Sequence, residues 1–266
     1  MKFVHAHSAS QGARRNQEDT AAIWPGGPAG GLMPPLQDGV LEGHDGQLLA
    51  VLADGMGGHA GGALASRLTC DAFIDSFVRG QGDSVVRLGH ALDASNAALA
   101  EKIRENPRLN GMGSTLIGTH FTAAGLFWVS VGDSPLYLFR RGELALLNED
   151  HSLAPEIDKL AAAGKLSWDM ARADPRRHFL RSAVTGEEIE MIDRSERALA
   201  LSVGDIVILA SDGLHTLDDD TVSAIVARGI PDGADAIAKA LVGGVLAANQ
   251  PHQDNITIVV VQVTDA

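Results

Sequence analysis

The chain has 266 residues and a mass of 27.8 kDa, and its 45% hydrophobic and 21% charged residues are typical of a folded globular protein. Its 21 Lys and Arg against 34 Asp and Glu give a formal net charge of −13. That charge argues against nucleic-acid binding and against docking on anionic lipid, because both need clustered cations. With one cysteine and no long apolar run, we expect a cytoplasmic protein that does not insert into a membrane.

Short strands rich in Val, Leu and Ile dominate the chain, and turn residues follow most of them. Two stretches read as hairpins, which implies that the strands pair mostly antiparallel. In chain order, the predicted strands and hairpins occupy residues 20–24, 48–54, 113–131, 135–148, 205–212 and 255–263.

Helical periodicity occurs in two pairs of segments. The first pair covers residues 62–78 and 84–106, where Pro107 ends the second helix, and the second pair covers 219–229 and 233–249. Strands, two helices, strands, two helices and a strand predict an α+β fold in which helices cover stacked antiparallel sheets. Without a repeat or a linker, we interpret residues 1–266 as one domain.

Two stretches lack clear periodicity. Residues 25–46 are rich in Gly and Pro and predict a mobile surface loop. Residues 155–178 predict a short helix with a basic cluster, Arg172, Arg176 and Arg177. This second stretch is either a solvated excursion or a flap that contacts substrate.

Acidic residues recur at the predicted strand ends. Asp54, Asp133 and Asp212 each end a strand, Asp254 precedes the last strand, and Glu18-Asp19 precede the strand 20–24. In an antiparallel sheet one strand ends where its neighbour begins, so these acids could converge on one edge. Each alone could be an ordinary turn or cap residue. Together they would need protons or cations, and oxygen ligands favour magnesium, manganese or calcium over zinc.

A glycine-rich segment, DGMGGHAGG, begins at Asp54. Its glycines let the backbone approach a ligand closely, so a carbonyl there could bind a metal, although a plain turn before a helix explains the pattern equally well. The segment ASDGL at 210–214 repeats the arrangement of a strand followed by Asp-Gly. This repetition favours the metal hypothesis.

The motifs taken together resemble the metal-dependent protein phosphatases of type 2C, the PPM family, in its compact bacterial form. That resemblance implies a four-layer αββα sandwich, hydrolysis of phosphoserine and phosphothreonine by a metal-activated water, and two Mn²⁺ or Mg²⁺ ions with a third possible. The matching segments are RRNQED (14–19), ADGMGGHAGG (53–62), GST (113–115), VSVGDS (129–134), NEDHS (148–152), ASDGL (210–214) and QDNIT (253–257).

The resemblance also implies roles for individual residues. Asp54 would bridge two metals, the Gly55 carbonyl would bind one, and Asp212 and Asp254 would complete the other; Asp133 would help bind the third. The implied catalytic set is Arg14, which would clamp the phosphate and has Arg15 as its alternative, Glu18, which would act through water, Asp19, and His59. His59 is either the general acid or a structural histidine at a helix start. We expect a monomer whose substrate is a phosphoprotein, namely a Ser/Thr kinase and its targets.

Two segments point to a narrower group within the family, and two other functions are also considered. RSAVTG at 181–186 with GDSP at 132–135 resembles phosphatases that oppose a threonine kinase controlling type VI secretion. One alternative is a pseudophosphatase that binds a phosphoprotein without cleaving it, which the full set of acids disfavours. Another is a metal-dependent nuclease, which the net charge of −13 disfavours.

Overall fold

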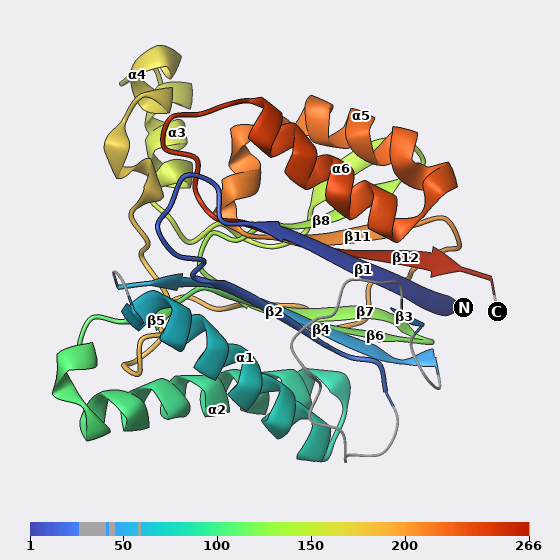
Figure 1. Cartoon of the computed structure of the whole chain (residues 1–266), viewed down its shortest axis with the longest axis horizontal. Coiled ribbons are helices and arrows are strands. Elements are labelled where there is room, and N and C mark those ends of the chain that lie inside the picture. Colours follow the sequence, from blue (N-terminus) through green and yellow to red (C-terminus); the bar gives the residue numbers. More distant parts are fainter. Residues whose placement is uncertain (27–40, 43–45, 58–59, 266) are drawn as a thin grey trace.

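The computed structural model describes residues 1–26, 41–42, 46–57 and 60–265. Its centre is two stacked sheets in which every described strand pair is antiparallel (Figure 1). The first sheet has the order β3 (Leu41–Glu42), β1 (Lys2–Ser10), β12 (Ile256–Thr264), β11 (Ile206–Ala210), β8 (Leu136–Arg140) and β9 (Glu143–Leu146). The second has the order β10 (Asp193–Arg194), β7 (Gly125–Val131), β6 (Leu116–Thr122), β4 (Leu48–Met56) and β2 (Asp19–Trp24), and β5 (Gly113–Ser114) pairs with β4.

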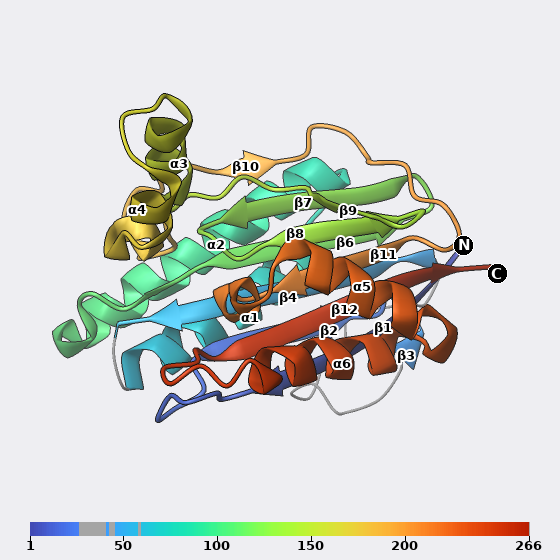
Figure 2. The same cartoon turned by 90° about the horizontal axis from the view of Figure 1, so that it is seen from above.

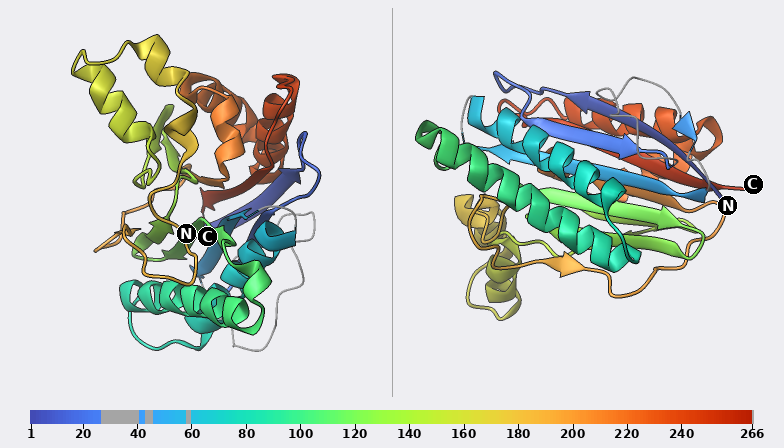
Figure 3. Two further views of the ribbon diagram at one scale, coloured as in Figure 1. Left: turned by 90° about the vertical axis from the view of Figure 1, so that its left-hand side faces the viewer. Right: turned by 90° about the horizontal axis from the view of Figure 1, so that it is seen from below.

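Two pairs of helices cover the outer faces of the sheets. In Figure 2, α5 (Asp219–Gly229) and α6 (Ala234–Ala247) lie over the first sheet. On the opposite side, α1 (Ala60–Arg79) and α2 (Ser84–Glu105) lie over the second sheet (Figure 3). Buried apolar side chains fill all three spaces between these layers, and the space between the sheets holds Phe3, Phe121 and Leu209. The predicted four-layer αββα sandwich is therefore confirmed.

Capping aspartates and a proline that can be identified in the sequence determine where several helices begin or end. The Asp83 side chain accepts a hydrogen bond from the Val86 amide at 3.0 Å and so caps α2, and Asp218 caps α5 in the same way. Beyond α2, Pro107 begins a short 3₁₀ turn, η2 (Pro107–Leu109), because it cannot continue the helix. Further 3₁₀ turns in the described part of the chain are η3 (Pro175–His178), η4 (Asp212–Thr216) and η5 (Ile230–Asp232). None of the helices in the described part of the chain is both long enough and apolar enough to span a membrane.

The segment 155–178 contains two helices, where we predicted one. They are α3 (Ala154–Ala162) and α4 (Trp168–Arg172), which pack on each other through Ile157, Ala161 and Ala171. They stand at the end of the sandwich away from both chain termini (Figure 1). The predicted basic cluster is neutralised locally, because its arginines pair with Asp169, Asp174 and Asp158. A role as a flap stays a prediction.

The predicted loop 25–46 lies largely outside the described residues. Within it, the structure describes Leu41–Glu42 as a strand that pairs with β1, which the sequence did not indicate. Strand β1 itself was also missed, although it pairs with β12 along its whole length from Lys2 to Ser10.

Two core histidines make the stability of the fold sensitive to acid. His5 on β1 and His120 on β6 are 2% and 3% exposed, and within the part of the chain that the structure describes the Nε2 atom of each has no hydrogen-bond partner. Burial lowers the pKa of each to about 4, with the charge of His7 adding to the effect at His5 and that of Arg87 at His120. Between pH 6.5 and 4 the unfolded chain therefore binds protons that the folded protein does not. As the pH is lowered through this range, the free energy of unfolding decreases by up to about 1.4 kcal/mol per pH unit for each histidine.

We expect His120→Phe to reduce the slope of unfolding free energy against pH in that window. Urea unfolding of this variant and of the wild type, from pH 7 to pH 4.5, measures the difference. His90→Gln is the matched control, because His90 is exposed on α2. Equal slopes for the wild type and His120→Phe, with native structure retained, would contradict the assignment.

Candidate metal centre

The candidate site begins at a pair of neighbouring aspartates. Asp19 opens β2 and Asp54 lies near the end of β4, and the two are direct partners in the antiparallel register. Their side chains therefore emerge on the same face of the sheet, close together. The Asp54 backbone is held from the other side, because its amide donates to Thr115 Oγ1 at 3.0 Å and its carbonyl accepts from the Thr115 amide at 2.9 Å.

The first sheet delivers further acids to the same end of the sandwich. Asp212 follows β11 and Asp254 precedes β12, and these two strands are antiparallel neighbours, so their acids share one edge. From the second sheet, Asp133 follows β7 and Glu18 precedes β2.

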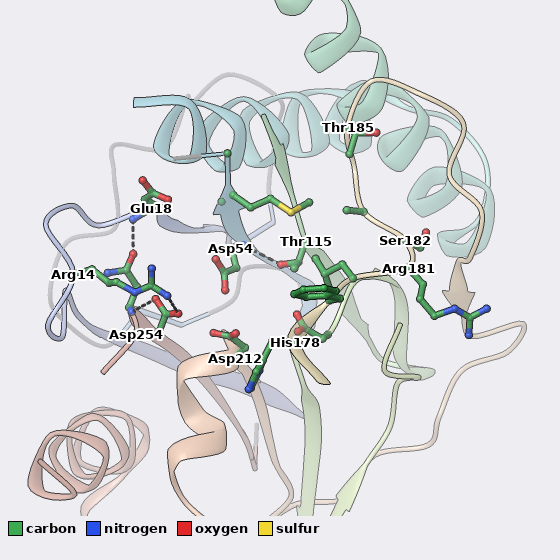
Figure 4. Close-up of a pocket in the computed structure, with 18 of the residues that line it drawn as sticks. Arg14, Glu18, Asp54, Thr115, His178, Arg181, Ser182, Thr185, Asp212 and Asp254 are labelled. Carbon is green, nitrogen blue, oxygen red and sulfur yellow. Dashed lines mark hydrogen bonds and ion pairs between the residues drawn. The ribbon is translucent and has the colours of Figure 1, made fainter. Parts of the chain in front are cut away.

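One pocket of about 1040 Å³ contains most of these acids. Asp54, Asp212 and Asp254 point into the same space in Figure 4, with Arg14 beside Asp254. Of the predicted site residues, the pocket is lined by Arg14, Arg15, Glu18, Asp54, Gly55, Asp133, Asp212 and Asp254. Asp19 lies behind it, within electrostatic reach of Asp54 and Asp212. The expected convergence of acids on one edge is thus what the structure shows.

The electrostatics of the pocket oppose a set of ionised carboxylates. Burial, followed by repulsion from Asp19 and Asp212, raises the pKa of Asp54 well above its ordinary value. Burial and then Asp212 raise the pKa of Asp133 to about 8. Burial also raises the pKa of Asp19 to about 6 and, together with the charge of Asp254, raises that of Asp212. Such a cluster is stabilised by protons or by bound cations.

Two buried carboxylate oxygens, Asp19 Oδ1 and Asp212 Oδ1, have no hydrogen-bond partner among the described residues. The other Asp19 oxygen accepts from Ser211 Oγ at 2.8 Å. Hard anionic oxygens without donors fit an oxygen-preferring divalent cation such as Mg²⁺ or Mn²⁺. The described residues do not, however, include any compact group of three or more His, Cys, Asp or Glu side chains at metal-ligating spacing. The acids therefore share a cavity without forming a closed cage.

Backbone packing around glycines holds together the loops that carry Glu18 and Asp54. The Gly55 amide donates to the Glu18 carbonyl at 3.2 Å. An added Cβ at Gly62, in the first turn of α1, would lie 2.9 Å from the Gly55 carbonyl oxygen. These close approaches require glycine, so the glycine-rich segment is more than a flexible turn.

An asparagine ties the two chain ends of the site to each other. Asn255 Nδ2 donates to the carbonyls of Gln11 and Asn16 at 2.8 and 3.0 Å, and its Oδ1 accepts from the Glu18 amide at 2.8 Å. The loop that carries Arg14 is therefore fixed by a residue next to Asp254. Arg14 itself forms an ion pair with Asp254. The resemblance assigns Arg14 to the phosphate of the substrate and Asp254 to a metal ion, whereas here the two side chains bind each other.

Three histidines, His59, His151 and His178, bear on the site in different ways. His59 lies outside the described residues, so its role stays a prediction. His151 is buried, and its Nδ1 accepts from the Gly132 amide at 3.2 Å, which holds the turn that precedes Asp133. His178, at the end of η3, lines the pocket, and its charge acts to lower the pKa of Asp212. Sequence reasoning missed His178, because no motif marks it and only the packing of 155–178 brings it there.

Comparison with known proteins decides the family. A family model described as protein phosphatase 2C matches residues 34–228. The chain belongs to the protein phosphatase 2C family. Among its protein phosphatase 2C relatives, the serine/threonine protein phosphatase PstP of Mycobacterium tuberculosis is 37% identical over 225 residues, which cover 84% of this chain and 41% of PstP. This chain therefore spans less than half of the length of PstP.

Other protein phosphatase 2C relatives match over most of their length. The serine/threonine phosphatase stp of Listeria monocytogenes is 31% identical over 84% of this chain and 88% of its own. The crystal structure of the PstP catalytic domain in complex with 2 manganese ions covers 100% of both chains, with a TM-score of 0.75 and 30% identity. PppA, a regulatory component of the type VI secretion system in Pseudomonas aeruginosa, has a TM-score of 0.71 and 28% identity over 98% of this chain and 97% of its own.

Proposed function

We propose that this protein is a metal-dependent phosphatase that hydrolyses phosphoserine and phosphothreonine in proteins. The observation that carries the proposal is the set of buried, mutually repelling aspartates around one pocket, with an arginine at its edge. The names of the relatives, serine/threonine phosphatases in both cases, support the substrate class.

Four residues around the pocket would bind two divalent cations. Asp54, the Gly55 carbonyl, Asp212 and Asp254 would hold them, and Asp133 would serve a third. When bound, such cations neutralise the phosphate and lower the pKa of a water molecule toward neutrality. Glu18 would orient water from the outer side, and Asp19, fixed by Ser211, would hold Asp54 in position.

Arg14 would bind the phosphate oxygens of the substrate through its two-pronged guanidinium. Its ion pair with Asp254 places it at the rim of the pocket, with the side chain about half exposed. Asp254 would exchange this partner for a cation, which frees Arg14 for the substrate. His59 stays the candidate general acid, and we propose its protonation of the leaving serine or threonine oxygen on the resemblance alone.

The phosphoprotein partners would be a Ser/Thr kinase and its targets. The likeness to PppA favours a kinase that controls a secretion system. A single domain over residues 1–266, a monomeric state and a location in the cytoplasm stay parts of this proposal.

Chelation is the direct test of the reaction. With Mn²⁺ the protein should hydrolyse para-nitrophenyl phosphate and a phosphothreonine peptide, and EDTA should lower both rates by at least about 100-fold, because the water loses its activation. Added Mn²⁺ should restore them. Tight binding of the peptide without release of phosphate would instead show a pseudophosphatase, and rapid cleavage of plasmid DNA by a pure sample would show a nuclease.

A further inference from the structure

A second cavity, of about 620 Å³, adjoins the phosphatase pocket. It lies between the loop that carries Arg14 and the first turns of α1, and Arg15 lines both cavities. We call it the Arg15–Arg67 groove; its lining residues are Gln11, Arg15, Asn16, Gln17, Ala63, Leu64 and Arg67. An extended substrate segment could therefore pass from one cavity into the other past Arg15.

The groove contains two arginines, Arg15 and Arg67, whose charges are not neutralised by a direct ion pair within the described part of the chain. Within the described residues, neither Arg15 nor Arg67 forms a salt bridge or a side-chain hydrogen bond. By contrast, Arg14 pairs with Asp254, and Arg181, which also lines the pocket, pairs with Glu156 at 2.6 Å. One acid stands near: Asp71, a turn further along α1, has its pKa lowered by Arg67, although burial raises it more.

The walls of the groove are joined by hydrogen bonds. Ser66, next to Arg67, donates to the Glu18 carbonyl at 2.6 Å, which ties α1 to the loop on the other side. Asn255 holds the carbonyls of Gln11 and Asn16. A ligand entering between these walls therefore meets a preformed surface, which lowers the entropic cost of binding.

The two arginines of the groove stand out against the acidic charge of the whole chain. A net charge of −13 disfavours the approach of an anionic substrate, and two guanidiniums in one groove without ion-pair partners among the described residues oppose that repulsion locally. Arginine binds both carboxylates and phosphates through paired N–H groups. Polar amides from Asn16 and Gln17 complete the lining.

We propose that the Arg15–Arg67 groove binds a second anionic group, a carboxylate or a phosphate, located near the phosphorylated residue in the same substrate chain. This inference rests on the proposed phosphatase function and adds a substrate preference to it. Proteins with acidic or multiply phosphorylated segments would then be the preferred substrates.

The test compares phosphothreonine peptides whose flanking residues are all neutral with peptides that carry one glutamate, moved one position at a time. A second series carries a non-hydrolysable phosphonate in place of the glutamate. At one or more positions we expect the anion to raise kcat/KM by about fivefold, the value of one exposed ion pair. An effect of glutamate and phosphonate alike shows recognition of any oxyanion, and an effect of the phosphonate alone shows recognition of phosphate.

The double variant Arg15→Gln/Arg67→Gln should lose this ratio between charged and neutral peptides, whatever happens to the overall rate. Arg141→Gln/Arg197→Gln removes the same charge from exposed positions near the opposite ends of the strands and should keep the ratio. No preference in the wild type, or a preference that survives in the groove variant, would overturn the inference. A wild type that hydrolyses neither para-nitrophenyl phosphate nor any peptide would instead refute the phosphatase function; anisotropy binding of the phosphonate peptides to the same variants then decides on the groove.

Discussion

Asp54→Asn should lower kcat/KM for phosphopeptides by at least about 1,000-fold, because this carboxylate is the proposed shared ligand of both cations. The same substitution should stabilise the metal-free protein. At neutral pH the wild type must either protonate Asp54 or bury its charge beside Asp19 and Asp212, and both cost free energy. We therefore expect the metal-free Asp54→Asn variant to have a higher Tm than the metal-free wild type.

Thermal unfolding with EDTA and with Mn²⁺ measures both sides of this prediction. Mn²⁺ should raise the Tm of the wild type by mass action, and Asp54→Asn should lose that increase. Asp93→Asn, at an exposed position of α2, is the control and should change neither activity nor Tm appreciably. An Asp54→Asn variant with full activity would refute the metal assignment, and a lower Tm without metal would refute the electrostatic argument.

Gly55→Ala should be among the most damaging single substitutions in the chain. An added Cβ would lie 2.1 Å from the Gly62 carbonyl oxygen and 2.6 Å from the Glu18 carbonyl oxygen, and backbone atoms on both sides cannot rotate away. The end of β4, the start of α1 and the Glu18 loop would have to separate. We expect a loss of roughly 3 kcal/mol of stability and at least about 100-fold in kcat/KM.

The matched control is the same chemical change where space is free. Gly243 lies on an exposed face of α6 with nothing within 4 Å of an added Cβ. Gly243→Ala should therefore stabilise the protein by about 0.5–1 kcal/mol, because alanine loses less entropy in a helix. Urea unfolding of the two variants measures the contrast, and equal effects of both would show that the close packing at Gly55 does not matter.

Whether a strand could be predicted from the sequence depended on how regular the hydrophobic pattern of its segment is. The run 48–54 is apolar at nearly every position and becomes β4, a central strand whose residues from Leu48 to Ala53 are fully buried. Strand β1 was missed because histidines, serines and alanines alternate in it. It forms because β12 offers a complete partner, and one of its histidines, His5, is buried at a cost in acid stability.

The sequence by itself determined the helix pairs, the strand-end aspartates and the family, because each depends on periodicity or on motifs within a few residues. Only the tertiary structure decided the ion pair of Arg14 with Asp254, the entry of His178 into the pocket and the groove beside Arg15. These depend on contacts between segments up to 240 residues apart. Such contacts follow from strand order and side-chain packing, which no local pattern encodes.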